Sequence, residues 1–456
     1  MTRSFAAVSQ VSATDQSRTG APVAARAIAH SHRKLPVVLS ATVVGFISLA
    51  AGLRLARFAF DSYDALIMYV VAKSIATTHT TIVPAAADPL KLMSPHSTYG
   101  LGTSLAESVA YLVAVHTGHD PVVFAMLVNP FLFAGTAVVI WAWARAAWAT
   151  ELQAAAVALA TSFGTMLLAY TSTGFSEMGT ALGVAVAILG VELAGRRPLV
   201  GGLLAGVGAA VAVLWRPDSA FLIAVPVAVA LVLRTRRGFP IFLLATIPVG
   251  IVTLLYNWSN GAQYGSFSPS VLFTHPLLTG IYGLLLSPAR GLVVYVPLVL
   301  LALLAVPWAW KRSAVITGLC LALLIIRIPF YAKVFAWMGG WTWGPRYLMP
   351  AMPCLAPLLF EIIRRFSWRR WPLAAAATAL IVVSVGVQVV GASVRYDTDT
   401  ANQKMTEVWR ANTYPAPQDA VMFDWKYFPI LEHLRELHHG RNLAPGYRGG
   451  VGLPPN

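Results

Sequence analysis

Two arginines stand at the start of long apolar runs, each directly after a turn that contains Pro or Gly. Arg290 belongs to "SPARG", and Arg346 belongs to "GGWTWGPRYLMP". A guanidinium group carries a permanent charge and donates paired hydrogen bonds, so these side chains could hold a phosphate at membrane depth. The alternative is that both arginines only reach from an apolar segment to the interface, and that Trp341 and Trp343 belong to an aromatic belt.

Charged side chains also follow the first long apolar run, in "RLARFAFDSYDA". They are spaced by 3, 4 and 3 residues, at Arg54, Arg57, Asp61 and Asp64. This spacing places them on one face of a helix if the run continues into the next segment. An acidic residue near hydrocarbon is costly unless it is paired or functional. Arg57 and Asp61 could therefore form a simple ion pair at a helix end, or the carboxylates could carry chemistry.

Other candidates come from short polar segments. Glu177 ends "TSTGFSE", where a negative charge also suits a helix N-terminus, and "WRPD" contains Arg216 together with an acid that makes a good helix start. His96 in "SPHSTYG" could touch a substrate, but the histidines show no spacing typical of metal ligands. Glu177, Arg216 and His96 are candidates for substrate binding rather than for a metal site.

The composition identifies the class of protein. The chain has 456 residues, of which 57% are hydrophobic and 11% charged, and apolar runs of about 20 residues recur along it. These features predict an all-α polytopic membrane protein. The net charge of +15 lies mostly in short segments between apolar runs, as the positive-inside bias and anionic membrane lipids explain, so no nucleic-acid partner is expected.

The apolar runs predict eleven membrane-spanning helices. They cover about 35–58, 121–148, 152–171, 178–195, 199–216, 218–234, 239–256, 290–310, 314–335, 347–364 and 373–394. The run 99–115 is short and contains Glu107, so it is either a twelfth span or a helix that lies in the interface. If it does not span, the basic clusters all fall on the cytoplasmic side, which is the arrangement we expect.

This topology defines three regions. Residues 1–34 form a cytoplasmic N-terminal tail, 35–394 the transmembrane domain with a large first outer loop at 61–120, and 395–456 an extracytoplasmic C-terminal tail. The long polar segments then share the outer face, where loops of that length indicate a working surface. The tail could cover a site, bind a partner or be a plain appendage.

Several of these stretches together resemble the GT-C superfamily of membrane glycosyltransferases, especially the dolichol-phosphate-mannose-type and family 39-like proteins. They are the acidic first loop, the "SE" loop, the "RPD" turn, "GLLLSPARGLVVYVPLVLL" and "GGWTWGPRYLMPAMP". The resemblance covers roughly 35–365, and the last two stretches are its most specific part. It implies a GT-C-like fold whose first outer loop contains interfacial helices.

The resemblance also implies an activity. A sugar would pass from a polyprenyl-phosphate donor to a glycan, lipid or protein acceptor of the cell envelope, on the outer face of the plasma membrane and with inversion. Asp61 or Asp64 would be the general base, because relatives have an acid here, often as adjacent Asp-Glu rather than "DSYD". Glu177 would be the second-loop acid, and Arg290 and Arg346 would be on the phosphate side.

The implied reaction needs only side chains of the protein as catalytic groups. A polyprenyl phosphate is an adequate leaving group, so one displacement needs a carboxylate and cations but no metal or other cofactor. Trp341, Trp343 and Tyr347 would stack on the sugar or pack the isoprenoid. The alternatives from other classes are a transporter or flippase of a lipid-linked glycan, which should show related halves, and a non-catalytic membrane protein of envelope assembly.

Overall fold

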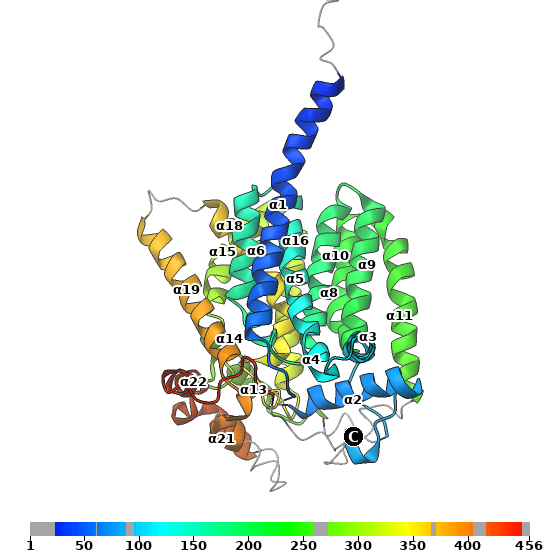
Figure 1. The fold of residues 1–456 in the computed structure, drawn as a ribbon. Helices are drawn as coiled ribbons and strands as arrows, with labels where there is room; N and C mark the ends of the chain where they lie inside the picture. The colour runs from blue at the N-terminus through cyan, green and yellow to red at the C-terminus, as the bar shows by residue number, and fades with distance from the viewer. Residues whose placement is uncertain are drawn as a thin grey trace, which may run out of the picture.

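The computed structural model describes residues 23–60, 62–87, 95–97, 99–259, 272–365, 371–398, 400–404 and 416–448. Figure 1 shows a bundle of long helices with several shorter helices gathered at one of its ends. The described residues form no strand, and only two isolated β-bridges pair extended segments, Ile82 with His96 and Val394 with Leu443. The predicted all-α class is confirmed.

The described residues up to Ser259 contain eleven α-helices. They are α1 (Val23–Leu55), α2 (Tyr63–Thr78), α3 (Leu101–Thr117), α4 (Pro121–Met126), α5 (Val128–Ala146), α6 (Glu151–Phe163), α7 (Met166–Tyr170), α8 (Glu177–Ala194), α9 (Pro198–Trp215), α10 (Val225–Arg234) and α11 (Phe239–Ser259). The described second half adds α13 (Leu277–Leu286), α14 (Leu292–Tyr295), α15 (Leu298–Arg312), α16 (Ala314–Ile325), α17 (Arg327–Ala332), the 3₁₀ helix η4 (Arg346–Cys354), α18 (Leu355–Arg365), α19 (Trp371–Ser393), α21 (Ala416–Phe423) and α22 (Pro429–His438).

Eight stretches of helix in the described residues are long and apolar enough to cross a membrane. They correspond to eight of the predicted spans. The other three predicted spans, 152–171, 218–234 and 290–310, are interrupted or shortened, although α6, α10 and α15 run alongside the long helices in Figure 1. The chain is a multi-pass membrane protein, but the count of eleven is not confirmed.

Local sequence explains the interruptions. Helix α6 ends at Gly164, and the Thr165 hydroxyl then accepts a hydrogen bond from the Leu167 amide and starts α7. Pro297, which has no amide hydrogen, separates α14 from α15. Apolar periodicity alone does not show these breaks, because apolar residues continue across each of them.

The first loop forms helices that lie across the end of the bundle. Figure 1 shows α2 and α3 crosswise to the long helices, with α3 seen end-on. The run 99–115 corresponds to α3, whose 17 residues pack against α2, α4 and α9. Its crosswise orientation agrees with an interfacial helix rather than with a twelfth span. This is the interfacial-helix architecture that the sequence predicts.

The C-terminal segment returns to the same end (Figure 1). After α19 it forms α21 and α22, and its far end hydrogen-bonds to the connection between α1 and α2: the Gly446 amide donates to the Ala56 carbonyl at 2.8 Å, and the Phe58 amide donates to the Tyr447 carbonyl at 2.7 Å. The described part of the tail is thus packed on the bundle next to the first loop.

Helices α8 and α9 approach each other closely through small residues. A Cβ atom on Gly183 would lie 2.6 Å from the Gly208 carbonyl oxygen, and one on Gly190 would lie 2.2 Å from the Ala205 nitrogen. Close backbone contact of this kind is how membrane helices associate without a hydrophobic driving force between them. It brings Glu177, which begins α8, to the same level as Arg216, which follows α9.

Candidate functional site

The glycines of "GGWTWGPR" shape the loop that leads to η4. Gly339, Gly340 and Gly344 have φ angles of 79°, 78° and 64°, which side chains with a Cβ rarely adopt. At Gly344 a Cβ atom would also meet the Tyr295 ring at 2.8 Å. The loop therefore requires glycine here, and it turns the chain so that Arg346 points into the protein.

Arg346 is the centre of a buried ionic network. Its Nε donates to Glu177 Oε1 at 2.7 Å, and its Nη1 donates to Asp64 Oδ2 at 2.5 Å. The guanidinium also lies 3.9 Å from the centre of the Phe175 ring, a favourable cation–π distance. The structure thus brings together the first-loop carboxylate, the second acidic candidate and one of the two predicted phosphate-side arginines.

Glu177 extends the network to a second arginine. The same Oε1 atom accepts a hydrogen bond from Arg216 Nη1 at 2.6 Å, and the Glu177 side chain is completely buried. Arg216 in turn pairs with Asp218 at 3.2 Å and donates to the Tyr331 hydroxyl at 3.1 Å. Carboxylates and guanidinium groups therefore alternate from Asp64 through to Asp218.

The pKa shifts follow from this alternation. Burial alone would lower the pKa of Arg216, but Asp218, Tyr331 and Glu177 outweigh it and raise the pKa well above its ordinary value. Burial alone would raise the pKa of Asp218, yet the charges of Arg216 and Arg327 lower it. Both groups stay ionised because each is surrounded by opposite charge.

Asp64 is the most exposed member of the network. Its side chain is 27% exposed, whereas the side chain of Arg346 is 5% exposed. Its Oδ1 accepts a hydrogen bond from the Tyr99 hydroxyl at 2.6 Å, and burial followed by the charge of Asp64 raises the pKa of Tyr99 well above its ordinary value. Each carboxylate oxygen can accept more than one hydrogen bond, so Asp64 can also receive one from a substrate. Asp61 lies outside the described residues.

Arg290 makes a different set of contacts. It is completely buried, and its three nitrogens donate to the carbonyl oxygens of Ala289, Met338 and Gly340 at 2.7 to 3.1 Å and to Asn402 Oδ1 at 2.6 Å. In the described part of the chain no carboxylate pairs with it. Arg290 therefore fixes the Gly339–Gly340 turn and the C-terminal segment while its positive charge stays uncompensated by an ion pair.

The aromatic candidates are placed differently from one another. Trp343 is buried between the rings of Tyr295 and His433, with ring centres 4.9 and 4.7 Å away. Tyr347 stacks on Tyr331 at 4.3 Å with the rings 6° from parallel, next to Arg216. Trp341 is partly exposed, which leaves it, unlike Trp343, able to meet a ligand without rearrangement.

His96 has no hydrogen bond to this network among the described contacts. Its backbone forms the bridge with Ile82, and its Nδ1 is buried without a hydrogen-bond partner. The described residues also contain no group of three or more His, Cys, Asp or Glu side chains arranged to hold a metal ion.

The structure adds residues that were not among the predicted site. From the sequence, Asp218 is expected only to start a helix, and Tyr99, Tyr331 and Arg327 are not among the predicted site residues. Arg327 is completely buried in the stretch Ala314–Ala332, which is apolar enough to span. A charged residue inside an apolar run is itself a signal of function, so the sequence alone could have indicated Arg327. Tyrosines in a sequence with 15 of them carry no comparable signal.

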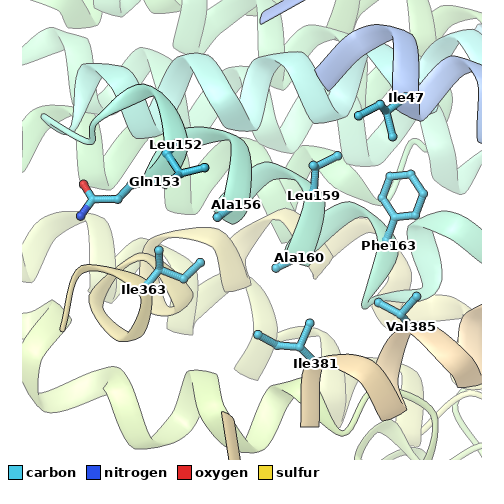
Figure 2. A pocket seen from close by; sticks show the side chains of 10 residues that line it. All are labelled: Ile47, Leu152, Gln153, Ala156, Leu159, Ala160, Phe163, Ile363, Ile381 and Val385. Atoms are coloured by element: carbon cyan, nitrogen blue, oxygen red, sulfur yellow. The ribbon is translucent and has the colours of Figure 1, made fainter. Parts of the chain in front are cut away.

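A cavity of about 650 Å³ lies away from the network, between α1, α6, α18 and α19. Figure 2 shows its lining, in which apolar side chains such as Leu159, Phe163 and Ile381 predominate and Gln153 is the polar exception. None of the residues that line it is ionisable. The cavity thus suits an apolar chain rather than proton transfer.

Comparison with solved structures identifies the architecture. The ArnT protein from Cupriavidus metallidurans matches with a TM-score of 0.52 over 91% of this chain and 78% of its own, at 14% identity. ArnT bound to undecaprenyl phosphate matches with a TM-score of 0.50 over 89% and 77%, also at 14% identity. The chain has the GT-C fold.

A second protein of known structure is similar to the same extent. The archaeal oligosaccharyltransferase AglB from Archaeoglobus fulgidus, in complex with an inhibitory peptide and a dolichol-phosphate, matches with a TM-score of 0.53 over 91% of this chain and 61% of its own, at 10% identity. No protein-family model and no curated protein matches the sequence. At these identities the likeness shows the fold, so the function is argued from the site.

Proposed function

We propose that the protein is an integral-membrane glycosyltransferase that moves a sugar from a polyprenyl-phosphate donor to an acceptor hydroxyl. The observation that carries this proposal is the network in which partly exposed Asp64 pairs with buried Arg346 and through it with Glu177 and Arg216. The network places a carboxylate beside fixed positive charge at the end of the bundle where the first loop and the C-terminal segment meet. The undecaprenyl phosphate and dolichol-phosphate bound by proteins of the same fold support the choice of carrier.

The reaction is a single displacement at the anomeric carbon. The acceptor oxygen forms a bond to that carbon while the bond from the carbon to the phosphate oxygen breaks, so the configuration inverts. Asp64 takes the proton of the acceptor hydroxyl, and the electron pair of the broken bond leaves with the polyprenyl phosphate. A general base contributes about 10²–10⁴ in rate to a step of this kind.

The arginines stabilise the charge that develops on the leaving phosphate. Arg346 is held at the site by two carboxylates, and Arg290 contributes a buried positive charge with no carboxylate partner among the described residues. Charges fixed in a buried site act more strongly than in water and need no reorganisation during the reaction. Glu177 is completely buried, so it orients Arg346 and Arg216 rather than contacting the acceptor in this conformation.

The location of the reaction follows from the predicted topology. The network lies at the end of the bundle that carries the long loops, which we assign to the outer face of the plasma membrane. The acceptor is then a glycan, lipid or protein of the cell envelope. Trp341 is partly exposed on the loop before Arg346 and offers a ring for stacking on a sugar.

The test is a transfer assay with the purified full-length protein in liposomes. A panel of polyprenyl-phosphate sugars is supplied together with envelope lipid, glycan and protein fractions, and both donor consumption and the anomeric configuration of the product are measured. Consumption of one donor with inversion is expected. If no donor is consumed while a lipid-linked glycan crosses the liposome membrane, the protein is a transporter and the proposal is wrong.

A further inference from the structure

Arg327 is a buried guanidinium group that the proposed reaction has not yet used. It begins α17, near one end of the apolar stretch Ala314–Ala332, and its side chain has no exposed surface. Charged side chains at such positions are expensive and are usually paired or part of a ligand pathway. The contacts of Arg327 therefore indicate which of these two roles applies.

Two of the three nitrogens of Arg327 have no hydrogen-bond partner. Nη1 donates to the Tyr347 carbonyl oxygen at 3.4 Å, which is long for such a bond, while Nε and Nη2 are buried and unpaired. By contrast, all three nitrogens of Arg290 donate hydrogen bonds. Burying charged donors without hydrogen-bond partners is energetically unfavourable.

The unpaired nitrogens form one recognition edge. The N–H bonds of Nε and Nη2 lie in the guanidinium plane and point outward along the same edge, so together they make a fork that fits two oxygens of a phosphate. The nearby carboxylate does not fill this fork: Asp218 accepts its hydrogen bonds from Arg216 and Tyr331 instead. Arg327 influences Asp218 only through its charge.

The surroundings connect this edge to the network. Asp218 pairs with Arg216 and is also influenced by the charge of Arg327, and Tyr347, whose carbonyl oxygen accepts from Arg327, stacks on Tyr331. Arg216 retains 16% exposure of its side chain. The charges of both guanidinium groups therefore act on Asp218, and Arg216 is the partly accessible one.

We propose that Arg327 is a phosphate-binding residue that takes the phosphate of the prenyl lipid in its Nε–Nη2 fork. This inference rests on the proposed function and assigns a further contact to its donor. Because Arg327 is completely buried in this structure, binding includes a local movement that opens the Nε–Nη2 edge. The competing role is structural, with Arg327 acting only as a counter-charge to Asp218.

Measurements of lipid binding, rather than of activity, distinguish the phosphate-binding role of Arg327 from a purely structural role. Dissociation constants for undecaprenyl phosphate and for undecaprenol, which lacks the phosphate, are measured on the full-length protein in nanodiscs. For Arg327→Gln we expect about tenfold or weaker binding of undecaprenyl phosphate, the equivalent of one lost charged contact, and unchanged binding of undecaprenol. Arg327→Lys keeps the charge but not the fork, so its affinity is expected to lie between those of the parent and Arg327→Gln.

Arg312→Gln is the matched control, because Arg312 is a largely buried arginine at the opposite end of the bundle, where it pairs with Glu361 at 3.2 Å. It is expected to leave both dissociation constants unchanged. Equal affinity for undecaprenyl phosphate in the parent and Arg327→Gln overturns the proposal; if that variant does not fold, equal affinity in Arg327→Lys overturns it. If the parent transfers sugar but Arg327→Gln binds undecaprenyl phosphate as tightly as the parent does, only this inference is wrong. If Arg327→Gln loses affinity for undecaprenyl phosphate alone but the parent transfers no sugar, only the proposed function is wrong.

Discussion

Asp64 and Arg346 are 282 positions apart in the sequence, and their side chains form an ion pair of 2.5 Å at the end of the helix bundle. Asp64 begins a helix of the first loop, and Arg346 begins the 3₁₀ helix after the glycine-rich turn. The pair is asymmetric, because the arginine is buried and the carboxylate is open to solvent on one side. This asymmetry is what a base beside fixed positive charge requires.

Asp64→Asn should lower the transfer rate about 10²- to 10⁴-fold, because the amide cannot accept a proton in the reaction. Donor affinity should change little, since the bond between Arg346 and Glu177 remains. Initial rates and donor dissociation constants are measured on the same preparations. Asp120→Asn is the control, because this exposed acid of the same loop only caps α4. Parent-like turnover of Asp64→Asn, with loss in Asp61→Asn, would assign the base to Asp61.

Glu177→Gln should destabilise the protein by about 3–5 kcal/mol, because buried Arg346 and partly buried Arg216 lose the carboxylate that they share. The expected result is a clear drop in the thermal unfolding temperature in detergent, together with a loss of transfer. Glu436→Gln removes an acid that pairs with a largely exposed arginine, Arg441, and should cost less than about 1 kcal/mol. Similar unfolding temperatures for the two variants would show that Glu177 does not hold the network together.

Much of the fold can be predicted from hydropathy, because a segment in lipid must form all of its backbone hydrogen bonds internally, as a helix does. Eight predicted spans appear as long apolar helices. The other three are interrupted or shortened, two of them by local features, the break at Gly164 and the proline at 297, in stretches where the apolar pattern itself continues. The orientation of α3 also depends on packing against α2 and α9 rather than on its own composition.

The site was predictable as a set of residue types but not as a set of contacts. Asp64, Glu177, Arg216 and Arg346 are expected candidates, and the structure joins them in one network. Arg290 shows the limit of this reasoning. Its acceptors are mainly backbone carbonyls of a turn that forms only when the "GGW" segment folds against it, and backbone acceptors have no signature in a sequence.

Asn402→Ala should loosen the attachment of the C-terminal segment to the site. Asn402 Oδ1 accepts the 2.6 Å bond from Arg290, and a hydrogen bond to a charged group contributes about 1.5–3 kcal/mol. Limited proteolysis after residue 394 should therefore become faster, and transfer should fall. Asn402→Asp keeps an acceptor for Arg290 but loses the hydrogen bond that Asn402 Nδ2 donates to the Tyr396 carbonyl oxygen at 2.7 Å, so its rate of proteolysis should lie between those of the parent and Asn402→Ala. Unchanged proteolysis of Asn402→Ala would mean that other contacts alone attach the segment.

The first loop and the C-terminal segment should lie on the same, outer side of the membrane. Both gather at one end of the bundle in Figure 1, while basic residues such as Arg234 and Arg312 pair with Glu192 and Glu361 at the other end, where the positive-inside bias predicts the cytoplasm. Two exposed positions, His116 in α3 and Lys426 before α22, are suitable for single cysteines.

An impermeant thiol reagent applied to intact cells should label His116→Cys and Lys426→Cys to the same extent. Arg196→Cys, an exposed position between α8 and α9, should react only after the cells are opened, and the native Cys320 and Cys354 are buried and should not interfere. Labelling of Arg196→Cys alone in intact cells would place the network on the cytoplasmic side. The donor would then have to be presented to the inner leaflet, and the proposed envelope acceptor would be excluded.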